Sequence, residues 1–484
     1  MPFVSAEEPF CFEDLAILNT PLPAQLQALK GAGRFTALRR AITARLADGW
    51  PAEQLRRRLV LELHILDRLE ADYTLTRDDV VTQLDALADG LTPSLLDEYE
   101  AKGLVDWLLI EGEVRYLNST VDNLLRIAPQ LHRRPWPDEQ RAKDEEAEKR
   151  ELPRIMMRDG QLAMRYRMRC RVRVRPEYVR EGCTVRVQLP LPIRTAQVED
   201  VSLLHTSHTP TLVAPEDHPQ RSVLIEKPLA RNDVFEIEYS YTVRNLYRDV
   251  YTLADADEAA RAAAAAGLPA KVLTEADRQR YLAEQPSHIA FTPALRTLAA
   301  SIVGDETDPL RKARAIYDRI CADLRYSYSR SYFATPDLSE AAAFNQRGDC
   351  GMMALLFITL CRICGIPARW QAGRTILPCS NSTGCHDWAM FYIEPFGWLW
   401  ADCSYGVSAR AAGDEERRRF YFGNTVPARL VLASEFSSPF AAPMRYLRFD
   451  PYDNQSGEAE YTDRGIPYGG LDCETVILEK ERID

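Results

Sequence analysis

Two neighbouring stretches decide the fold: residues 346–373 read QRGDCGMMALLFITLCRICGIPARWQAG, and residues 384–406 read GCHDWAMFYIEPFGWLWADCSYG. In the first stretch Cys350 follows Gly348 and Asp349 and opens an apolar helix pattern that ends near Gly365. A helix N-terminus offers unpaired backbone N–H groups and the positive end of the helix dipole, which favour a thiolate. We therefore predict that Cys350 is an activated nucleophile.

The second stretch predicts a β-hairpin that carries a histidine and an aspartate. His386 begins its first strand pattern, Asp402 ends the second, and residues 394–397 contain the turn. In an antiparallel hairpin the residue numbers of all directly paired couples have the same sum. The side chains of His386 and Asp402 lie on the same face only if that sum is even. Pairing Ile393 with Gly397 meets this condition and places Asp402 diagonal to His386, whereas a loop one residue shorter would separate them. We expect the odd-length loop or a bulge.

A thiolate becomes a catalyst only when a base lies beside it and a third group orients that base. His386 and Asp402 supply these two groups if the hairpin register is as expected. Asp387 is the competing orienter, but neighbours on a strand point to opposite faces, so it should point away from the His386 face.

The ordered set of features resembles the core of the transglutaminase-like superfamily, whose members use Cys, His and Asp in that chain order. The matching features are Gly-Asp-Cys350 opening a helix, Gly365-Ile-Pro-Ala-Arg369, Gly373, His386-Asp-Trp388, and Gly397-Trp398 leading into Asp402. The resemblance covers about residues 285–410. It implies a papain-like core in which Cys350 is the nucleophile, His386 the general base and acid, and Asp402 the orienter of the imidazole.

Donors for the oxyanion and walls for the cleft are also expected near this core. The backbone N–H of Cys350 is the first oxyanion candidate. This fold usually adds a side-chain donor from the upstream strand, which Tyr326 or Tyr328 could supply, although an alternating tyrosine pair is as often packing. Trp388 is expected to wall the cleft or pack beneath it.

Length and composition describe a protein of several folded domains. At about 100–200 residues per domain, 484 residues make two to four domains. The apolar fraction of 46% and charged fraction of 27% are those of a globular chain, which excludes disorder and a membrane bundle. The net charge of −11 argues against a nucleic-acid partner. No signal peptide and no membrane segment are visible, so we expect a cytoplasmic protein without membrane contact.

Pattern changes along the chain predict a multidomain α+β protein. The expected units are a helical domain at 1–133, a charged linker at 134–158, an antiparallel β-sandwich at 159–250, a helical connector at 251–286, the transglutaminase-like core at 287–450 and a C-terminal extension at 451–484. Within the core, the cysteine helix should pack on an antiparallel sheet.

The first strand of the predicted sandwich carries a row of arginines. Residues 164–175 read MRYRMRCRVRVR, a strict alternation that predicts a half-buried strand. An arginine row could bind an anion. However, residues 234–243 read VFEIEYSYTV, so Glu236 and Glu238 could neutralise the row by cross-strand pairing. We favour this structural role.

The remaining cysteines do not indicate a metal. Eleven cysteines in a chain without a visible signal peptide favour reduced thiols. Cys361, Cys364, Cys379 and Cys385 could form a four-thiolate zinc site only if the first two left an apolar helix, so we predict no metal and no cofactor. Cys379 and Cys385 flank a polar loop before His386 and could oxidise reversibly.

The leading hypothesis is cysteine-dependent acyl transfer or hydrolysis on a peptide or protein amide through a thioester. Water as the second nucleophile would make a peptidase or deamidase, and a lysine amine would make a cross-linker. The alternative is a non-catalytic scaffold or interaction protein that keeps the core. A protein partner for the N-terminal helical domain is left open.

Overall fold

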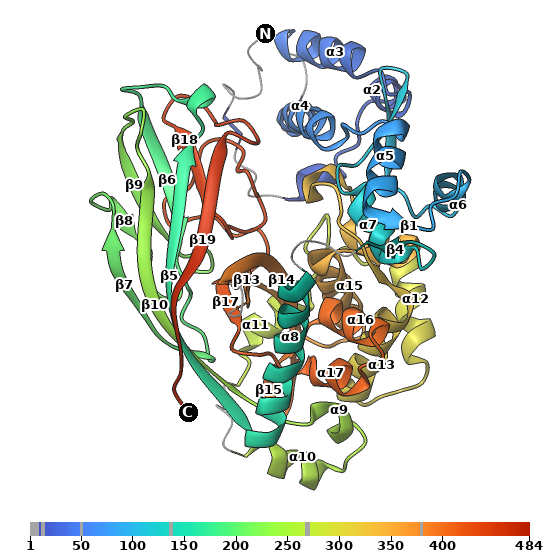
Figure 1. Cartoon of the computed structure of the whole chain (residues 1–484), viewed down its shortest axis with the longest axis vertical. Coiled ribbons are helices and arrows are strands. Elements are labelled where there is room, and N and C mark those ends of the chain that lie inside the picture. The colour runs from blue at the N-terminus through green and yellow to red at the C-terminus, as the bar shows by residue number, and fades with distance from the viewer. Residues whose placement is uncertain (1–8, 11–14, 49–51, 135–138, 267–271, 378–380) are drawn as a thin grey trace.

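The computed structural model describes residues 9–10, 15–48, 52–134, 139–266, 272–377 and 381–484. Figure 1 shows long strands gathered on one side of the molecule, the N-terminal helices at the upper part of the other side, and the core helices below them. Within the described parts of the chain, no helix is both long enough and apolar enough to cross a bilayer.

The N-terminal region is mainly helical. Its helices are α2 (Ala24–Gly31), α3 (Phe35–Ala47), α4 (Glu53–Asp72), α5 (Arg77–Leu87), α6 (Leu95–Ala101) and α7 (Thr120–Ile127), after a 3-10 turn at Leu15–Asn19. A hairpin of β2 (Trp107–Ile110) and β3 (Glu113–Tyr116) and a short pair, β1 (Ala88–Asp89) with β4 (His132–Arg133), interrupt them. The leucine face of α4 is buried in the main core, whereas α5 to α7 bury a smaller core of their own.

The segment predicted as a charged linker forms one helix, α8 (Glu139–Asp159). This helix packs along α17 (Glu415–Phe420), where Glu146 accepts a hydrogen bond of 2.8 Å from Arg417. The charged residues of the segment therefore belong to a helix packed on the core, not to an extended linker.

Two four-stranded antiparallel sheets form the sandwich. One sheet has the order β19-β5-β10-β7, and the other has the order β18-β6-β9-β8. The strands are β5 (Gln161–Val174), β6 (Thr184–Pro190), β7 (Val198–Thr206), β8 (Leu212–Val213), β9 (Ser222–Pro228), β10 (Phe235–Leu246), β18 (Glu458–Tyr461) and β19 (Leu471–Arg482). A 3-10 turn at Pro176–Tyr178 follows β5. Alternate residues of β5 and β10 fill the space between the sheets.

The arginine row on β5 is neutralised, as the sequence predicts. In the register of β5 and β10, Arg171 faces Glu236 and Arg169 faces Glu238. Arg167 bonds Glu238 at 2.8 Å, and Arg171 pairs with Glu236. Carboxylates of β19 pair with the row from the other side. These contacts leave no reason to assign the row to an external anion.

The C-terminal segment is not an appendage to the core, which differs from the predicted extension at 451–484. β19 pairs with β5 along most of its length, and β18 pairs with β6. Each sheet of the sandwich therefore needs a strand from the end of the chain. The short apolar stretch at residues 475–478 is a visible signal for a strand, but it does not indicate which strand is its partner.

The core is a five-stranded antiparallel sheet covered by helices. The sheet has the order β16-β15-β14-β13-β17. Its strands are β13 (Ala368–Leu377), β14 (Ser382–Ile393), β15 (Gly397–Ala401), β16 (Phe422–Gly423) and β17 (Arg429–Ala433). The helices around it are α9 (Val250–Leu253), α10 (Glu258–Ala265), α11 (Glu275–Leu282), α12 (Pro293–Val303), α13 (Pro309–Asp323), α14 (Leu338–Asn345), α15 (Cys350–Ile363), α16 (Cys403–Ala411) and α17. The pair β11 (Arg325–Tyr326) with β12 (Arg347–Gly348) and a 3-10 turn at Tyr332–Ala334 complete it.

The cysteine helix packs on this sheet, as predicted. Helix α15 contacts β14 and β13, and Phe357 of the helix meets Phe391 of β14 edge to face, with ring centroids 5.5 Å apart. Nearly every residue of α15 is buried because neighbouring helices cover its other sides. The apolar pattern of residues 352–361 reflects this complete burial.

The hairpin register is the one that the sequence predicts. Ile393 pairs with Gly397 across a three-residue turn, and Ala389 pairs with Ala401. The residue directly after β15 is Asp402, which is thereby placed diagonal to His386. Because the pairing with β15 ends at Ala389, no strand of the described residues pairs with residues 386–388 of β14 on that side.

Candidate active site

Cys350 is the first residue of α15, and Asp349 caps this helix. The Asp349 carboxylate accepts the backbone N–H of Met352 at 3.1 Å and the hydroxyl of Tyr332 at 2.5 Å. Gly351 follows in a crowded position, where a Cβ atom would lie 2.1 Å from the Tyr332 oxygen and 2.7 Å from a carboxylate oxygen of Asp387. The sequence Asp-Cys-Gly therefore fixes the helix start and leaves room for side chains around the sulfur.

His386 and Asp402 are in contact. Nε2 of His386 lies 2.8 Å from Oδ2 of Asp402, and both residues are buried. Asp402 caps α16, accepting the backbone N–H of Tyr405 at 3.1 Å, and also accepts a bond of 2.9 Å from Arg429. The sequence analysis missed Arg429, although an arginine inside the apolar run of residues 428–433 is a visible signal for a buried ion pair.

The charges around this pair favour a neutral histidine and an ionised aspartate. Burial lowers the pKa of His386 below its ordinary value, although the Asp402 carboxylate opposes this shift. Burial alone would raise the pKa of Asp402, but His386 and Arg429 outweigh it and hold that pKa below its usual range. A neutral imidazole is the form that can accept a proton.

The Cys350 sulfur contacts Asp387 rather than the histidine. The thiol donates to Oδ2 of Asp387 at 3.6 Å, and Oδ1 of Asp387 accepts a bond of 2.6 Å from the Gln455 amide. The same amide accepts the backbone N–H of His386 at 3.0 Å through its oxygen. Gln455 thus holds residues 386 and 387 together from a segment far along the chain.

The expected nucleophile–base contact is not made in this structure. Among the described residues Cys350 forms no hydrogen bond with His386, and Nδ1 of His386 bonds to none of them. The cause is strand alternation, because Asp387 points to the α15 side and His386 points to the Asp402 side. The prediction that Asp387 faces away from His386 is confirmed, and the sulfur lies on the Asp387 side.

The prediction of a resting thiolate is wrong for this arrangement. Burial raises the pKa of Cys350 well above its ordinary value, and the carboxylates of Asp387 and Asp349 add to the increase. The backbone N–H of Asp387 lowers it, but by less. The helix N-terminus does not outweigh these effects, so the surroundings of Cys350 favour the thiol over the thiolate.

Replacing Asp387 by asparagine should make Cys350 more reactive. The change removes the carboxylate beside the sulfur and keeps the side-chain shape, so the pKa of the thiol falls and more thiolate exists at neutral pH. We expect alkylation of Cys350 by iodoacetamide to accelerate severalfold at neutral pH. Mass spectrometry of the Cys350 peptide measures the rate. The thiol of Cys183, which is half-buried and does not line the cavity, is the internal control, and an unchanged Cys350 rate would contradict the assigned role of Asp387.

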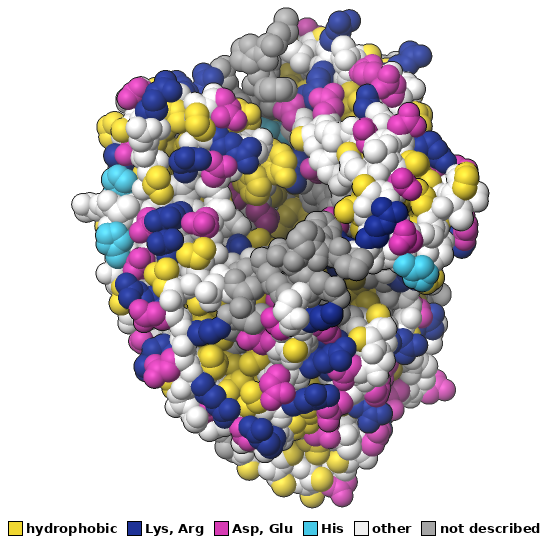
Figure 2. All heavy atoms as spheres, in the orientation of Figure 1, with side chains coloured by type: hydrophobic (Ala, Val, Ile, Leu, Met, Phe, Trp, Pro, Cys, Tyr) yellow, Lys and Arg dark blue, Asp and Glu magenta, His cyan; other side chains and the backbone are white. Residues whose placement is uncertain are grey.

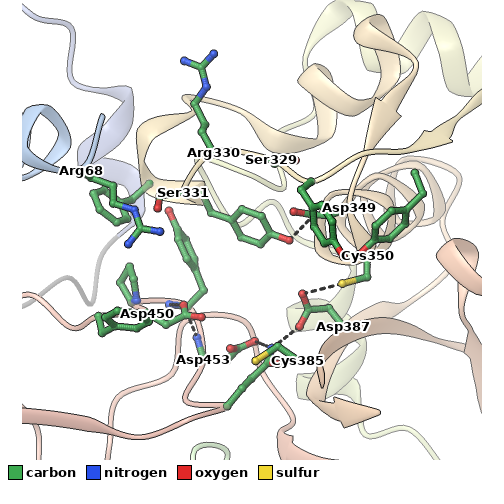
Figure 3. A pocket seen from close by; sticks show the side chains of 18 residues that line it. Arg68, Ser329, Arg330, Ser331, Asp349, Cys350, Cys385, Asp387, Asp450 and Asp453 are labelled. Carbon is green, nitrogen blue, oxygen red and sulfur yellow. Dashed lines mark hydrogen bonds between the residues drawn. The ribbon is translucent and has the colours of Figure 1, made fainter. Parts of the chain in front are cut away.

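The sulfur lines a cavity of about 300 Å³ (Figure 3). Its walls come from the segment 326–333, from Asp349 and Cys350, from Cys385 and Asp387, and from residues 449–453 and Gln455, with Arg68 of α4 at one side. Figure 2 shows the molecular face hollowed between the N-terminal helices and the strands. Cys350 is 9% exposed, so the sulfur is reachable but deeply set.

His386 lines a different cavity of about 750 Å³. Tyr326, Tyr328 and Cys385 line both cavities, so the two meet at these residues. Tyr326 is therefore placed near the sulfur, as the oxyanion hypothesis requires. The Tyr328 hydroxyl accepts a bond of 3.1 Å from Arg126 and is engaged with the N-terminal region.

Trp388 does not wall either of these cavities. It is 1% exposed and packs against Val198 and Val431 on the His386 side of the sheet. Its indole N–H donates to Gln371 at 2.7 Å. The ring lies beneath His386, with centroids 5.6 Å apart, and so supports the imidazole from below.

The other described cysteines form neither a disulfide nor a metal site. All nine described cysteines are free thiols. Cys361 is buried inside α15 and Cys364 ends that helix, and the described residues contain no cluster suited to a metal ion. Cys379 lies outside the described residues, so its pairing with Cys385 stays a prediction.

Sequence reasoning also missed the contribution of residues 450–455. Tyr452, Asp453 and Gln455 are buried around the cavity and lie beyond the predicted core, and Asp450, the last residue of that core, is half-buried beside them. A run of buried polar residues looks like an ordinary surface loop in a sequence. No pattern in the chain could have indicated that it faces Cys350.

Residues 296–403 match the family model described as the transglutaminase-like superfamily. No curated protein matches the chain. Among solved structures, a candidate cysteine protease from Cytophaga hutchinsonii is similar at 16% identity and a TM-score of 0.40, covering 67% of this chain and 91% of that one. The periplasmic domain of TgpA from Pseudomonas aeruginosa is similar at 16% identity and a TM-score of 0.28, covering 56% and 96%. Residues 296–403 are thus a transglutaminase-like core, which supports cysteine-based catalysis in general.

Proposed function

We propose that the protein catalyses acyl transfer or hydrolysis on peptide or protein amides through a thioester on Cys350. His386 is the proposed general base and acid, and Asp402 the residue that orients it. The observation that carries the proposal is the 2.8 Å contact of His386 with Asp402, directly beside the residue whose carboxylate meets the Cys350 sulfur. A neutral, oriented imidazole next to a cysteine at a helix start is what thiol acyl transfer needs.

The first step requires the thiol to turn from Asp387 toward His386. The S–H proton passes to Nδ1 of His386, the sulfur bonds to the amide carbon, and the carbonyl electron pair moves to oxygen. Asp387, which holds the sulfur, and His386 are neighbouring residues of β14, which supports a short movement of the thiol from one side chain to the other. The backbone N–H of Cys350 and the hydroxyl of Tyr326 are the proposed donors to the oxyanion.

The second half-reaction regenerates the enzyme. The oxyanion re-forms the carbonyl, the C–N bond breaks, and the leaving nitrogen takes the proton from His386. A second nucleophile, activated by the same imidazole, then displaces the sulfur from the thioester. Water makes the protein a peptidase or deamidase, and an amine makes it a cross-linker, with the same three residues in each case.

One observation favours the alternative of a scaffold without activity. The sulfur is placed against Asp387 at 3.6 Å, its pKa is raised by burial, and no hydrogen bond with His386 is formed in the described part of the chain. In a core that had lost catalysis, the Cys350 thiol could stay against Asp387 permanently. The proposed reaction therefore depends on a rearrangement of one side chain, and activity tests decide between the two functions.

Capture of the acyl-enzyme by hydroxylamine tests the proposal. Hydroxylamine attacks a thioester, releases the thiol and leaves a hydroxamate on the acyl group. The full chain, incubated with a digest of mixed proteins and hydroxylamine, should produce peptide hydroxamates that mass spectrometry locates. A His386→Ala variant should produce almost none. Equal yields from both proteins would refute the assigned role of His386.

The N-terminal region is proposed to support the site, in addition to any partner that it binds. Asn123 of α7 accepts the backbone N–H of Tyr328 at 2.8 Å and donates to its carbonyl at 3.0 Å. Arg330 pairs with Asp106 from the same region. These contacts hold the 326–333 wall of the Cys350 cavity. A protein partner and a cytoplasmic location remain predictions from the sequence.

A further inference from the structure

We propose that the cavity beside Cys350 recognises a positively charged organic group, an ammonium or a guanidinium, on the acyl-donor substrate. This inference rests on the proposed function and adds the substrate class. It starts from the charges of the residues that line the cavity, which are strongly unbalanced.

Four carboxylates line the cavity: Asp349, Asp387, Asp450 and Asp453. Figure 3 shows Asp387, Asp450 and Asp453 on neighbouring parts of the wall below Cys350. The two arginines of the wall are already paired elsewhere. Arg68 bonds Asp72 at 2.9 Å, and Arg330 pairs with Asp106. Arg448 lies near Asp450 but donates to the carbonyl of Ser438 at 3.0 Å.

Asp453 has an oxygen without a donor. The residue is 2% exposed, and its Oδ1 accepts no hydrogen bond from the described residues. Its Oδ2 accepts a bond of 3.1 Å from Gln455. Burial raises the pKa of Asp453 well above its ordinary value, and the neighbouring carboxylates of Asp450 and Asp387 raise it further, whereas the Gln455 hydrogen bond and the charge of Arg448 oppose the shift by less. A buried carboxylate among carboxylates is costly unless a proton or a cation joins them.

The remaining walls suit an organic cation. Aromatic rings line the cavity, among them Tyr326, Tyr328, Tyr332, Phe449 and Tyr452. The faces of such rings attract ammonium and guanidinium groups. A metal ion would need several carboxylates converging on one point, and the described residues contain no such group.

The positive charge that the cavity binds belongs to the acyl donor rather than to an attacking amine. An amine must lose its proton before it can attack a thioester, and carboxylates around it would stabilise the protonated form. A charge that takes no part in the reaction has no such conflict. Because Asp387 lies 3.6 Å from the sulfur, the bound cation would lie close to the scissile amide. It would also favour the thiolate, so substrate binding would help to activate Cys350.

Charged thiol reagents test this without any need for catalysis. In the full chain, 2-aminoethyl methanethiosulfonate carries a positive charge and 2-sulfonatoethyl methanethiosulfonate a negative one. The thiolate forms a disulfide with either, and methanesulfinate leaves. The ratio of the two rates at Cys350, divided by the same ratio for N-acetylcysteinamide in solution, reports the charge selectivity of the cavity. We expect at least about tenfold preference for the cation.

Matched variants assign the selectivity to the cavity. Asp453→Asn and Asp450→Asn should each lower the ratio at least about threefold, whereas Asp85→Asn, on the exposed side of α5, should leave it unchanged.

Calorimetry provides a second readout: wild-type protein should bind n-butylammonium and not n-butanol, and Asp453→Asn should weaken this binding. The proposal would be overturned if the cation-to-anion rate ratio at Cys350 equalled that of the free thiol. If Cys350 reacts with neither reagent, absence of n-butylammonium binding would overturn it. Hydroxamate formation from uncharged peptides alone would refute the substrate class and leave the proposed function intact.

Discussion

Replacing Cys350 by alanine is expected to abolish hydroxamate formation and every related amide reaction. The sulfur is the atom proposed to bond to substrate, and the one other described thiol that lines this cavity is Cys385, which lies on the far side of Asp387. Loss of a catalytic nucleophile lowers kcat by roughly 10⁴-fold or more. The rate of hydroxamate production per enzyme, with folding checked by circular dichroism, measures the effect.

Cys364→Ala is the matched control for this experiment. Cys364 ends the same helix and is half-buried, away from the cavity, so its loss should leave the rate within about twofold of wild type. A Cys350→Ala protein that kept its rate would remove the enzyme assignment and leave the scaffold as the function of the core.

Asp402→Asn is expected to have the second-largest effect and to act on both rate and stability. The amide keeps the shape but loses the charge that holds His386 in the required tautomer, and such a change costs about 10⁴-fold in kcat in the comparable serine protease triad. It also removes the counter-ion of Arg429, which is 2% exposed and bonds Asp402 at 2.9 Å. Leaving that charge unpaired should lower the free energy of unfolding by about 3 kcal/mol.

Denaturant unfolding and kcat, measured on the same preparations, separate the two effects. Asp414→Asn is the matched control, because Asp414 caps the next helix in the same way but lies outside the His386 contact. It should lower stability by about 1 kcal/mol or less and spare the rate. An Asp402→Asn protein with the wild-type rate would show that His386 is oriented without Asp402.

The hairpin of β14 and β15 is the part of the site that the sequence alone could predict. Strand alternation and a parity argument on the turn gave the pairing of Ile393 with Gly397, the diagonal contact of His386 with Asp402, and the opposite direction of Asp387. The helix start at Cys350 was equally visible, because Asp349 and the apolar run after it are local signals. These features depend only on neighbours in the chain or on one short loop.

The partner of the sulfur could not be predicted in the same way. Whether Cys350 meets residue 386 or residue 387 depends on how far α15 lies over the open edge of β14, which is a packing distance without a sequence signature. Gln455 and Asp453 reach the cavity from beyond the core, because β18 and β19 return to the sandwich and carry the preceding loop past Cys350. Long-range pairing of this kind is decided by the whole fold.

The return of β18 and β19 to the sandwich has a consequence for the time at which this protein can act. A ribosome releases Cys350, His386 and Asp402 well before it releases Gln455 and the strands that hold it in place. Until then the nascent chain carries the thiol without Gln455 and without the strands that complete the sandwich. The proposed reaction therefore has to wait for the synthesis of residues far beyond the three that would carry it out.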